Sequence, residues 1–324
     1  MNSIGFLINP QAGRVRGRVA AVRAAATRAG LCREATDLAG IGQAARELVE
    51  SGAEILAING GDGTVQGAIT AVLGAGLALP ELAIIPGGTT NMTANDFHGR
   101  LSMNAAMEAA IRAAGLPAVE RARVRRPLIE AKLPSGERQV GLFLSAGATL
   151  TGMDHFRENV GSKGLRDELS AGISLVRGLI GLARGEDAWS QGPGIDYRLG
   201  PDEPWHEGQA MVIATTLERL IMGLRPWWGS QPLPMHVTAI GHEPRRLLRR
   251  APALLRGRGG AGLGPEEGYR SDNAGAIELR PGGAIGLDGE VFPVPAEEVV
   301  SAVATPPVSF LNLSGGGRRV PKGR

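Results

Sequence analysis

The sequence predicts an α/β domain with a mostly parallel sheet, followed by a β-rich domain. Its 324 residues suffice for two domains that each bury a core. In the first third of the chain, short apolar runs that suit strands alternate with alanine-rich stretches that suit helices, as in parallel sheets covered on both faces. From Pro127 onward, short strand-like runs separated by glycine and proline predominate.

These patterns set the expected domain boundaries. We assign residues 1–122 to the α/β domain and residues 123–311 to the β-rich domain, whose final strand has the option of returning to the first domain. The glycine- and arginine-rich residues 312–324 are expected to form a disordered tail.

The elements of the first domain follow one another in strand–helix units. Strands are expected at 3–8, 31–36, 55–58 and 82–85, and helices at 16–29, 41–51, 65–73 and 104–114. Ligands of such sheets bind beyond the carboxyl ends of the strands. Polar loops that follow these strands are therefore expected to meet at one edge.

The second domain is expected to contain many short strands and one helix. Strands are expected at 127–133, 139–146, 195–199, 209–215, 235–240, 276–279 and 284–287. The helix is expected at 165–183, where leucine, isoleucine and valine recur at helical spacing. Core packing is the favoured interpretation of its apolar face, and a lining for an acyl chain is the alternative.

The loop after the third expected strand reads Gly60-Gly61-Asp62-Gly63-Thr64 and opens a helix. Glycines allow the backbone to approach a bound group, and free amides at a helix N-terminus favour anions. A carboxylate such as Asp62 suits phosphate if a divalent cation lies between them, or if a hydroxyl must be oriented there. The alternative is an ordinary flexible surface turn.

Three further stretches accompany this loop in a fixed order. Asn9-Pro10-Gln11-Ala12-Gly13 follows the first strand, Pro86-Gly87-Gly88-Thr89-Thr90-Asn91 follows the fourth, and Leu287-Asp288-Gly289-Glu290 lies far downstream. Together the four stretches resemble the diacylglycerol kinase catalytic-domain family, which includes bacterial lipid kinases and sphingosine kinases. The resemblance implies an α/β nucleotide-binding domain, a β-sandwich-like domain and an active cleft between them.

The resemblance also implies which residues carry the chemistry. The expected cofactors are ATP and Mg²⁺. The nucleotide-binding residues that it implies are Asn9, Pro10, Gly13, Thr36, Gly60, Gly61, Gly63, Thr64, Gly88, Thr89, Thr90 and Asn91. Glu290 would be the general base, Asp62 a catalytic residue, and Asp62 with Asp288 the metal ligands. The pair Asp288-Gly289 is also a strong signal for a two-residue hairpin turn, whatever the function.

Some positions depart from the family pattern. Asn91 is followed by Met92 where the family has aspartate, and an Asn-Asp pair occurs only at Asn95-Asp96. Asp96 would recover the role only if it lies one helical turn later on the same face, and we assign it to substrate binding. Asp154 resembles an acceptor-contacting position, with a surface carboxylate as the alternative. Residues 225–243 contain no aspartate, so no structural magnesium is expected there.

The cysteine count and the apolar runs of the sequence indicate the cellular location that we expect. One cysteine excludes an intramolecular disulfide, and no apolar run has membrane-spanning length. With no signal peptide in view, we expect a cytoplasmic protein that is peripheral at the membrane. Two segments, 225–228 with adjacent tryptophans and 245–258 with arginines and leucines, suit a membrane surface. The alternative is a basic loop with buried tryptophans.

The sequence therefore predicts an ATP-dependent lipid kinase that phosphorylates a lipid hydroxyl, such as that of diacylglycerol. An NAD kinase is the first alternative, and a non-catalytic nucleotide- or lipid-binding module is the second. The expected partners are ATP and a lipid at a membrane surface, with no nucleic acid. The sequence does not fix the oligomeric state, and a homodimer is one of the possibilities.

Overall fold

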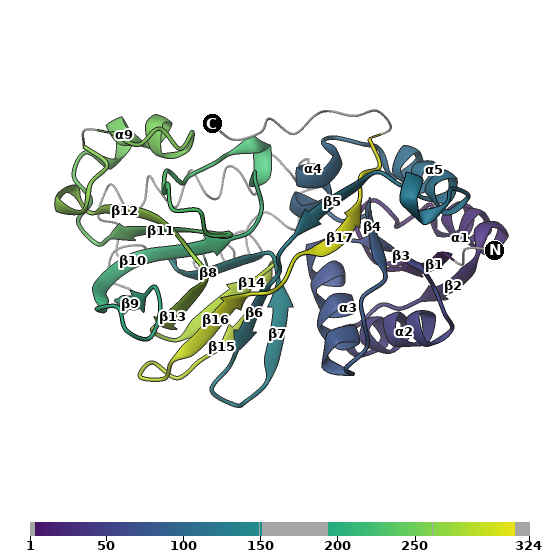
Figure 1. Cartoon of the computed structure of the whole chain (residues 1–324), viewed down its shortest axis with the longest axis horizontal. Coiled ribbons are helices and arrows are strands. Elements are labelled where there is room, and N and C mark those ends of the chain that lie inside the picture. The colour runs from purple at the N-terminus through teal and green to yellow at the C-terminus, as the bar shows by residue number, and fades with distance from the viewer. Residues whose placement is uncertain (1–3, 149, 151–193, 261, 315–324) are drawn as a thin grey trace. The chain divides into compact units, whose positions relative to one another are not determined.

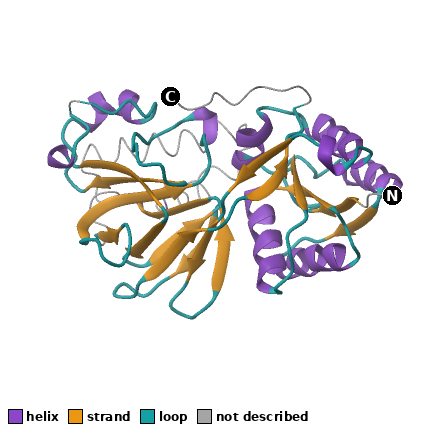
Figure 2. Ribbon diagram, viewed as in Figure 1, coloured by secondary structure: helices purple, strands orange, loops and turns teal. Residues whose placement is uncertain are grey.

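The computed structural model of the chain describes residues 4–148, 150, 194–260 and 262–314. It divides into two compact units, one made of Met1–Arg126 with Val308–Arg324 and the other of Pro127–Pro307. The first is an α/β unit and the second is an antiparallel β unit, so the predicted fold class is confirmed (Figures 1 and 2).

The sheet of the first unit has six strands in the order β2-β1-β3-β4-β17-β5. The strands are β1 (Ile4–Ile8), β2 (Leu31–Glu34), β3 (Ile55–Gly60), β4 (Glu81–Pro86), β5 (Arg123–Arg126) and β17 (Val308–Leu311). β1 to β4 are parallel, β17 runs parallel to β4, and β5 is antiparallel to β17. The carboxyl ends of β1, β3 and β4 therefore lie at one edge.

Helices cover both faces of this sheet (Figure 1). They are α1 (Val19–Ala29), α2 (Leu38–Glu50), α3 (Asp62–Gly74), α4 (Met92–His98) and α5 (Met103–Ala114). Side chains of α1 and α5 share a core with one set of alternating strand residues. On the other face α2 packs closely on α3, because a Cβ atom at Gly42 would come within 2.8 Å of the Ala71 Cβ atom.

The helices differ from the sequence prediction mainly at their starts. α2 begins at Leu38 rather than at 41, because Asp37 caps it through the Gly40 N–H. α1 begins at Val19 rather than at 16, since Gly17 has a φ of 82° and interrupts the helical backbone. α3 begins at Asp62 rather than at 65, with Gly61 as its N-cap residue. α4 was not predicted, because its seven residues show no helical periodicity.

The end of the described chain belongs to the first unit. Asn312 donates its backbone N–H to the carbonyl of Ala122, and Leu313 is buried in the core with Leu311. The segment that the sequence assigned to a tail thus starts within packed structure. β5 was missing from the predicted strands, since it reads as a run of charge. β17 is a final strand that returns to the first unit, an option that the sequence analysis allowed.

The second unit contains an eleven-stranded, antiparallel sheet. Its main path is β15-β14-β8-β10-β9-β13-β16-β6-β7, with β11 joined to β10 and β12 joined to β11. The strands are β6 (Ile129–Lys132), β7 (Arg138–Gly141), β8 (Phe143–Gly147), β9 (Ile195–Arg198), β10 (His206–Thr215), β11 (Met235–Gly241), β12 (Tyr269–Ala274), β13 (Ala276–Arg280), β14 (Ala284–Leu287), β15 (Glu290–Pro293) and β16 (Val300–Ala304). Apolar residues from most of these strands form one buried cluster.

The strand predicted at 139–146 is in fact two strands, β7 and β8. The chain turns between them at Leu142, where backbone N–H groups leave the ladder and bind the Asp288 carboxylate. The unit also has a helix that the sequence did not predict, α9 (Leu247–Leu254). The helix predicted at 165–183 lies outside the described residues. Over the described chain, no helix has the length and apolar character needed to cross a membrane.

Candidate functional site

Three loops of the first unit meet at the carboxyl edge of its sheet. They follow β1, β3 and β4, and their backbones are joined by hydrogen bonds. The N–H of Arg14 donates to the Gly87 carbonyl at 2.9 Å. The N–H groups of Gly87 and Gly88 donate to the Gly60 carbonyl at 3.0 and 2.9 Å. The structure therefore brings together the three N-terminal motifs that the sequence predicted to converge.

Close contacts require glycine at two positions of these loops. A Cβ atom at Gly88 would lie 2.3 Å from the Gly61 Cα atom, which is closer than real Cβ contacts. One at Gly60 would lie 2.5 Å from the Thr64 Cβ atom. Close approach to the neighbouring backbone at Gly88, and to the Thr64 side chain at Gly60, thus explains glycine at these two positions. The motif pattern alone predicts contact with a ligand at these glycines.

Asn9 connects the first loop to the start of α3. Its Nδ2 donates to the Thr64 hydroxyl at 3.1 Å, and its Oδ1 accepts from the Gln11 N–H at 3.0 Å. Pro10 and Gly13 continue this loop, and a Cβ atom at Gly13 would lie 3.3 Å from the Thr89 hydroxyl oxygen. Asn9 and Thr64 are therefore positioned by each other.

Asp62 holds the start of α4. Its Oδ2 accepts from the Met92 N–H at 3.0 Å, and its Oδ1 accepts from the Thr93 N–H at 2.9 Å. A carboxylate at this position also interacts favourably with the positive end of the helix dipole. Burial raises the pKa of Asp62, while these backbone hydrogen bonds oppose the rise. Asp62 thus joins the second motif to the third.

Asn91 closes the loop between β4 and α4. Its Oδ1 accepts from the Gly88 N–H at 2.8 Å, and its Nδ2 donates to the Gly88 carbonyl at 2.7 Å. The residue adopts a φ of 51°, a left-handed conformation that asparagine tolerates better than most residues. Because the side chain is buried and turned to its own loop, its role is to shape that loop.

Hydrogen-bonding groups remain for a ligand at this edge. Gly61, the N-cap residue of α3, has no side chain, so the amides of Asp62 and Gly63 in its first turn lack a side-chain cap. The half-buried Thr89 and Thr90 hydroxyls make no hydrogen bond within the part of the chain that the structure describes. Such donors suit phosphate oxygens. Thr36 is exposed in the loop after β2, one strand further along the edge.

Asn59 is a residue at this edge that the sequence analysis did not select. It is fully buried at the end of β3, and neither side-chain atom has a hydrogen-bond partner among the described residues. Its Oδ1 lies close to Gly87, because a Cβ atom added at Gly87 would be 2.5 Å from this oxygen. A buried amide of this kind normally has a partner. The polar residue at the end of an otherwise apolar strand was the signal available in the sequence.

Asp96 lies on α4 and forms an ion pair. Its Oδ2 is 3.4 Å from the Arg126 guanidinium, and the Asp96 side chain is 1% exposed. The same guanidinium lies 5.9 Å from the centre of the Phe97 ring, which stacks on Phe310. Asp96 therefore fastens α4 to β5, and this contact supports a structural role rather than the expected substrate contact.

Asp288 and Gly289 form the two-residue turn between β14 and β15 in the second unit. Both have positive φ angles, 47° and 94°, and Leu287 pairs with Glu290 across the turn. The buried Asp288 carboxylate accepts from the N–H groups of Leu142 and Phe143, both at 2.9 Å. This geometry supports a structural role for Asp288. Glu290 is half-buried at the start of β15, an end strand of the sheet.

Among the residues that the structure describes, acidic side chains do not assemble a metal cage. Within the described ranges, no group of at least three His, Cys, Asp or Glu side chains could hold a metal ion. Magnesium commonly keeps several waters and takes one or two carboxylates together with substrate phosphates. Asp62, beside the uncapped α3 amides, fits that donor set better than Asp288. Asp154 lies outside the described residues.

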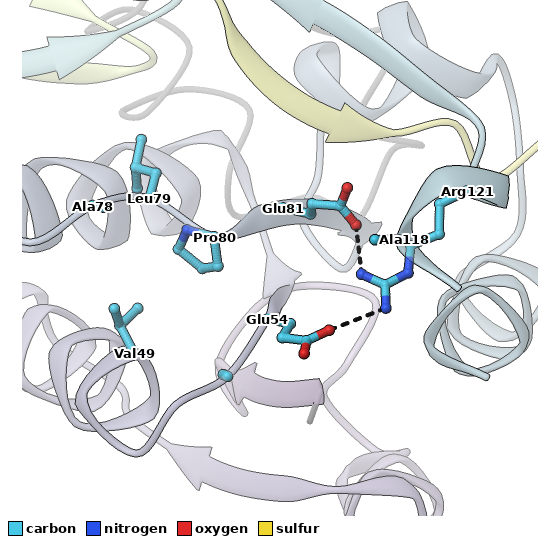
Figure 3. A pocket seen from close by; sticks show the side chains of 9 residues that line it. Val49, Glu54, Ala78, Leu79, Pro80, Glu81, Ala118 and Arg121 are labelled. Atoms are coloured by element: carbon cyan, nitrogen blue, oxygen red, sulfur yellow. Dashed lines mark hydrogen bonds and ion pairs between the residues drawn. The ribbon is translucent and has the colours of Figure 1, made fainter. Parts of the chain in front are cut away.

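A cavity of about 400 Å³ lies at the opposite edge of the same sheet. Figure 3 shows the Arg121 guanidinium pointing between two carboxylates, those of Glu54 and Glu81. It is 3.2 Å from Glu54 and 2.8 Å from Glu81, and its side chain is 1% exposed. Glu54 precedes β3 and Glu81 begins β4, so this ion-pair cluster lies at the amino ends of the strands. It contains none of the predicted site residues.

Comparison with known proteins supports the resemblance drawn from the motifs. Residues 3–119 match the family model for the diacylglycerol kinase catalytic domain. Three solved structures from Bacillus anthracis str. Sterne are similar over 96% of this chain and 97% of theirs. One, described as a "putative diacylglycerol kinase", is 14% identical with a TM-score of 0.66, and a second, described as a diacylglycerol kinase, is 13% identical with a TM-score of 0.62. At this identity they establish the fold. No curated protein gives a significant match.

Proposed function

We propose that this chain, whose residues 3–119 match the diacylglycerol kinase catalytic domain, is an ATP-dependent kinase that phosphorylates a lipid hydroxyl. One observation carries the proposal. The loops after β1, β3 and β4 interlock at the carboxyl edge of a parallel sheet and leave the α3 N-terminus uncapped. Parallel sheets bind ligands at this edge, and phosphate binds well at a free helix N-terminus.

The residues of this edge divide between ligand contact and support. The backbone amides of Asp62 and Gly63 would donate hydrogen bonds to phosphate oxygens, and the Thr89 and Thr90 hydroxyls would add further donors. Asn9, Thr64 and Asn91 would act through the loop conformation that they hold. Phosphoryl transfer depends chiefly on such positioning and on electrostatic stabilisation.

Magnesium would neutralise charge on the phosphates of the bound nucleotide. Asp62 is the described carboxylate at this edge whose surroundings fit that ion. Its two oxygens already accept backbone N–H groups, and each keeps a further lone pair for a water molecule of the ion. Asp62 would thus orient the ion while it holds α4.

Glu290 is the proposed general base for the acceptor hydroxyl. The assignment rests on the Leu-Asp-Gly-Glu motif and on the difference between its two carboxylates. The Asp288 carboxylate is consumed by backbone contacts, whereas no hydrogen bond or ion pair of the Glu290 side chain exists within the described residues. A general base must keep its carboxylate available for the substrate proton. Asp154 is retained as a proposed acceptor contact on the motif alone.

The test is transfer of labelled γ-phosphate from ATP with magnesium into a mixed lipid extract. A parallel reaction contains NAD. The wild type should label an organic-soluble product, and Glu290→Gln should lower that rate by at least about 100-fold, the usual range for loss of a general base. An unchanged unfolding midpoint of Glu290→Gln serves as the control for its fold. Label in NADP would identify an NAD kinase instead, and no label in either reaction would contradict the kinase proposal.

A further inference from the structure

We propose that α9 and its flanking residues form a docking surface for an anionic lipid bilayer. This surface, named here the arginine face, consists of Arg245, Arg246, Leu248, Arg249, Pro252, Arg256 and Arg258. It belongs to the second unit and is labelled α9 in Figure 1. It would deliver a lipid kinase to its substrate. Its binding is measurable without nucleotide or acceptor, so it is tested separately from phosphoryl transfer.

The two sides of α9 differ in their surroundings. Leu247 and Leu254, two turns apart, are 2% and 1% exposed and anchor the helix in the unit. Leu248 is 54% exposed, and Pro252, one turn later on the same side, is exposed as well. Apolar groups therefore lie on the solvent side of a helix whose other side is already packed.

Both ends of α9 are held by the rest of the unit. The Tyr269 hydroxyl donates to the Arg245 carbonyl at 2.9 Å, before the helix begins. After it ends, the Arg225 N–H donates to the Leu255 carbonyl at 3.0 Å. Tyr269 is itself fully buried. The exposed residues of the arginine face are thus presented on a fixed base.

The charge of this segment is entirely of one sign. Residues 244–265 contain six arginines and neither aspartate nor glutamate. Within the described chain, Arg245, Arg246, Arg249 and Arg258 form no ion pair with an acidic side chain. Other arginines of the protein do pair, as Arg198 does with Glu278 and Arg121 does with Glu81. The arginine face therefore presents cations that form no ion pair with a described acidic side chain, with Glu243, Glu266 and Glu267 as the acidic residues that flank it in the sequence.

An anionic bilayer can bind both the arginines and the exposed apolar residues of this face. Lipid phosphates attract the arginines, and the interface accepts the leucine and proline between them. A nucleic acid would meet the charge but leave Leu248 without an apolar partner, and α9 offers no aromatic ring on which a base could stack. The combination favours the anionic bilayer.

Of the two tryptophans expected at a membrane surface, Trp227 does not take part. Trp227 is 8% exposed, and its ring stacks on His236 at 4.8 Å between centroids. Trp228 is tied to the Ser271 hydroxyl through its backbone N–H at 2.9 Å. Arg225, at the start of that segment, forms an ion pair with Glu218. The alternative of buried tryptophans and an exposed basic segment is therefore correct for Trp227, and the membrane assignment rests on α9.

Sedimentation with vesicles tests the proposal. Vesicles of phosphatidylcholine are compared with vesicles that also contain phosphatidylglycerol, using the full chain without nucleotide. We expect binding only to the anionic vesicles. The double variant R245Q/R249Q should lower the partition coefficient by roughly 25-fold, about fivefold for each arginine near the surface. L248S should lower it by about tenfold, because burial of the leucine in the interface is lost.

A matched control variant loses the same two positive charges, but from helices outside the arginine face. R28Q/R112Q removes two exposed arginines from helices of the first unit and should bind like the wild type. Unfolding curves of all variants report their fold. Equal binding of the wild type to both vesicle types, or undiminished binding by R245Q/R249Q and L248S, would overturn the proposal. Wild-type binding to duplex RNA without binding to anionic vesicles would overturn it in favour of a nucleic acid.

Discussion

At the scale of single residues, two aspartates of the motifs perform the same task in different units. Asp62 accepts the N–H groups of Met92 and Thr93, and Asp288 accepts those of Leu142 and Phe143. In each case a carboxylate binds two consecutive amides of a segment far away in sequence. Charge-assisted hydrogen bonds of this kind are among the stronger ones in proteins. These motif residues are therefore structural, whatever further role Asp62 has.

Gly88→Ala tests whether the site glycines exist for loop contact. The added Cβ atom would meet the Gly61 Cα atom at 2.3 Å, so the backbone must shift. We expect a loss of about 1–3 kcal/mol in the free energy of unfolding, the usual cost of overpacking. Denaturant titration measures it.

The matched control is Gly74→Ala at the end of α3, where an added Cβ atom has nothing within 4 Å. Alanine there should stabilise by up to about 1 kcal/mol, since it restricts the unfolded chain. Equal effects of the two substitutions would show that the glycines of the loop are not tightly packed.

His98 predicts a pH dependence of stability. Its side chain is 7% exposed at the end of α4, and burial lowers its pKa from 6.5 to about 4, against the opposing effect of the Ile84 backbone. Between these values the unfolded state binds a proton that the folded state does not, so stability is complete above pH 6.5 and falls toward pH 4. The shift corresponds to about 3 kcal/mol.

His98→Gln removes this titration and isolates its contribution. Urea unfolding of the wild type and the variant at several pH values should show a steeper acid loss in the wild type. Parallel pH profiles of the two proteins would rule out a buried, neutral His98.

At the scale of elements, α4 shows a helix fixed by a distant residue. Its own sequence supplies seven residues and an N-cap asparagine that is turned to Gly88 rather than to the helix. The cap comes from Asp62, thirty positions earlier, through both carboxylate oxygens. The existence of α4 therefore depends on the fold of the second motif.

Asp62→Asn should uncouple these elements. The asparagine side chain has one acceptor oxygen where aspartate has two. Its NH₂ group would therefore face one of the two backbone N–H groups that now donate to the Asp62 carboxylate. We expect a loss of about 1–3 kcal/mol for the unsatisfied buried donors. Asp37→Asn is the control, because Asp37 caps α2 through one bond from the Gly40 N–H and asparagine is an equally good cap. Equal stability of both variants would contradict the bridging role of Asp62.

The contrast between α4 and the other elements explains what the sequence could predict. The apolar strands β1, β3 and β4 and the hairpin turn at Asp288-Gly289 are specified by neighbouring residues, and all were predicted. The split of β7 from β8 and the start of α4 each depend on an aspartate that contacts its partner across the fold. No local pattern encodes those contacts.

At the scale of the whole molecule, the chain forms an α/β unit, leaves it after Arg126, builds the β unit and returns at Val308. The returning strand β17 fills the place between β4 and β5. β5 and β17 are thus neighbours in the sheet although the whole second unit lies between them in the chain. Convergence of the first three motifs was predictable because parallel strands end at a common edge.

Hydrogen exchange with and without ATP and magnesium would show whether the nucleotide binds at the carboxyl edge of the sheet in the first unit. We expect ATP to slow exchange in the loop after β1, at the start of α3 and in the loop that ends at Asn91. The opposite edge, around Glu54 and Arg121, should exchange as it does without ATP. Protection at that opposite edge alone, or none in the three loops at saturating ATP, would contradict the account.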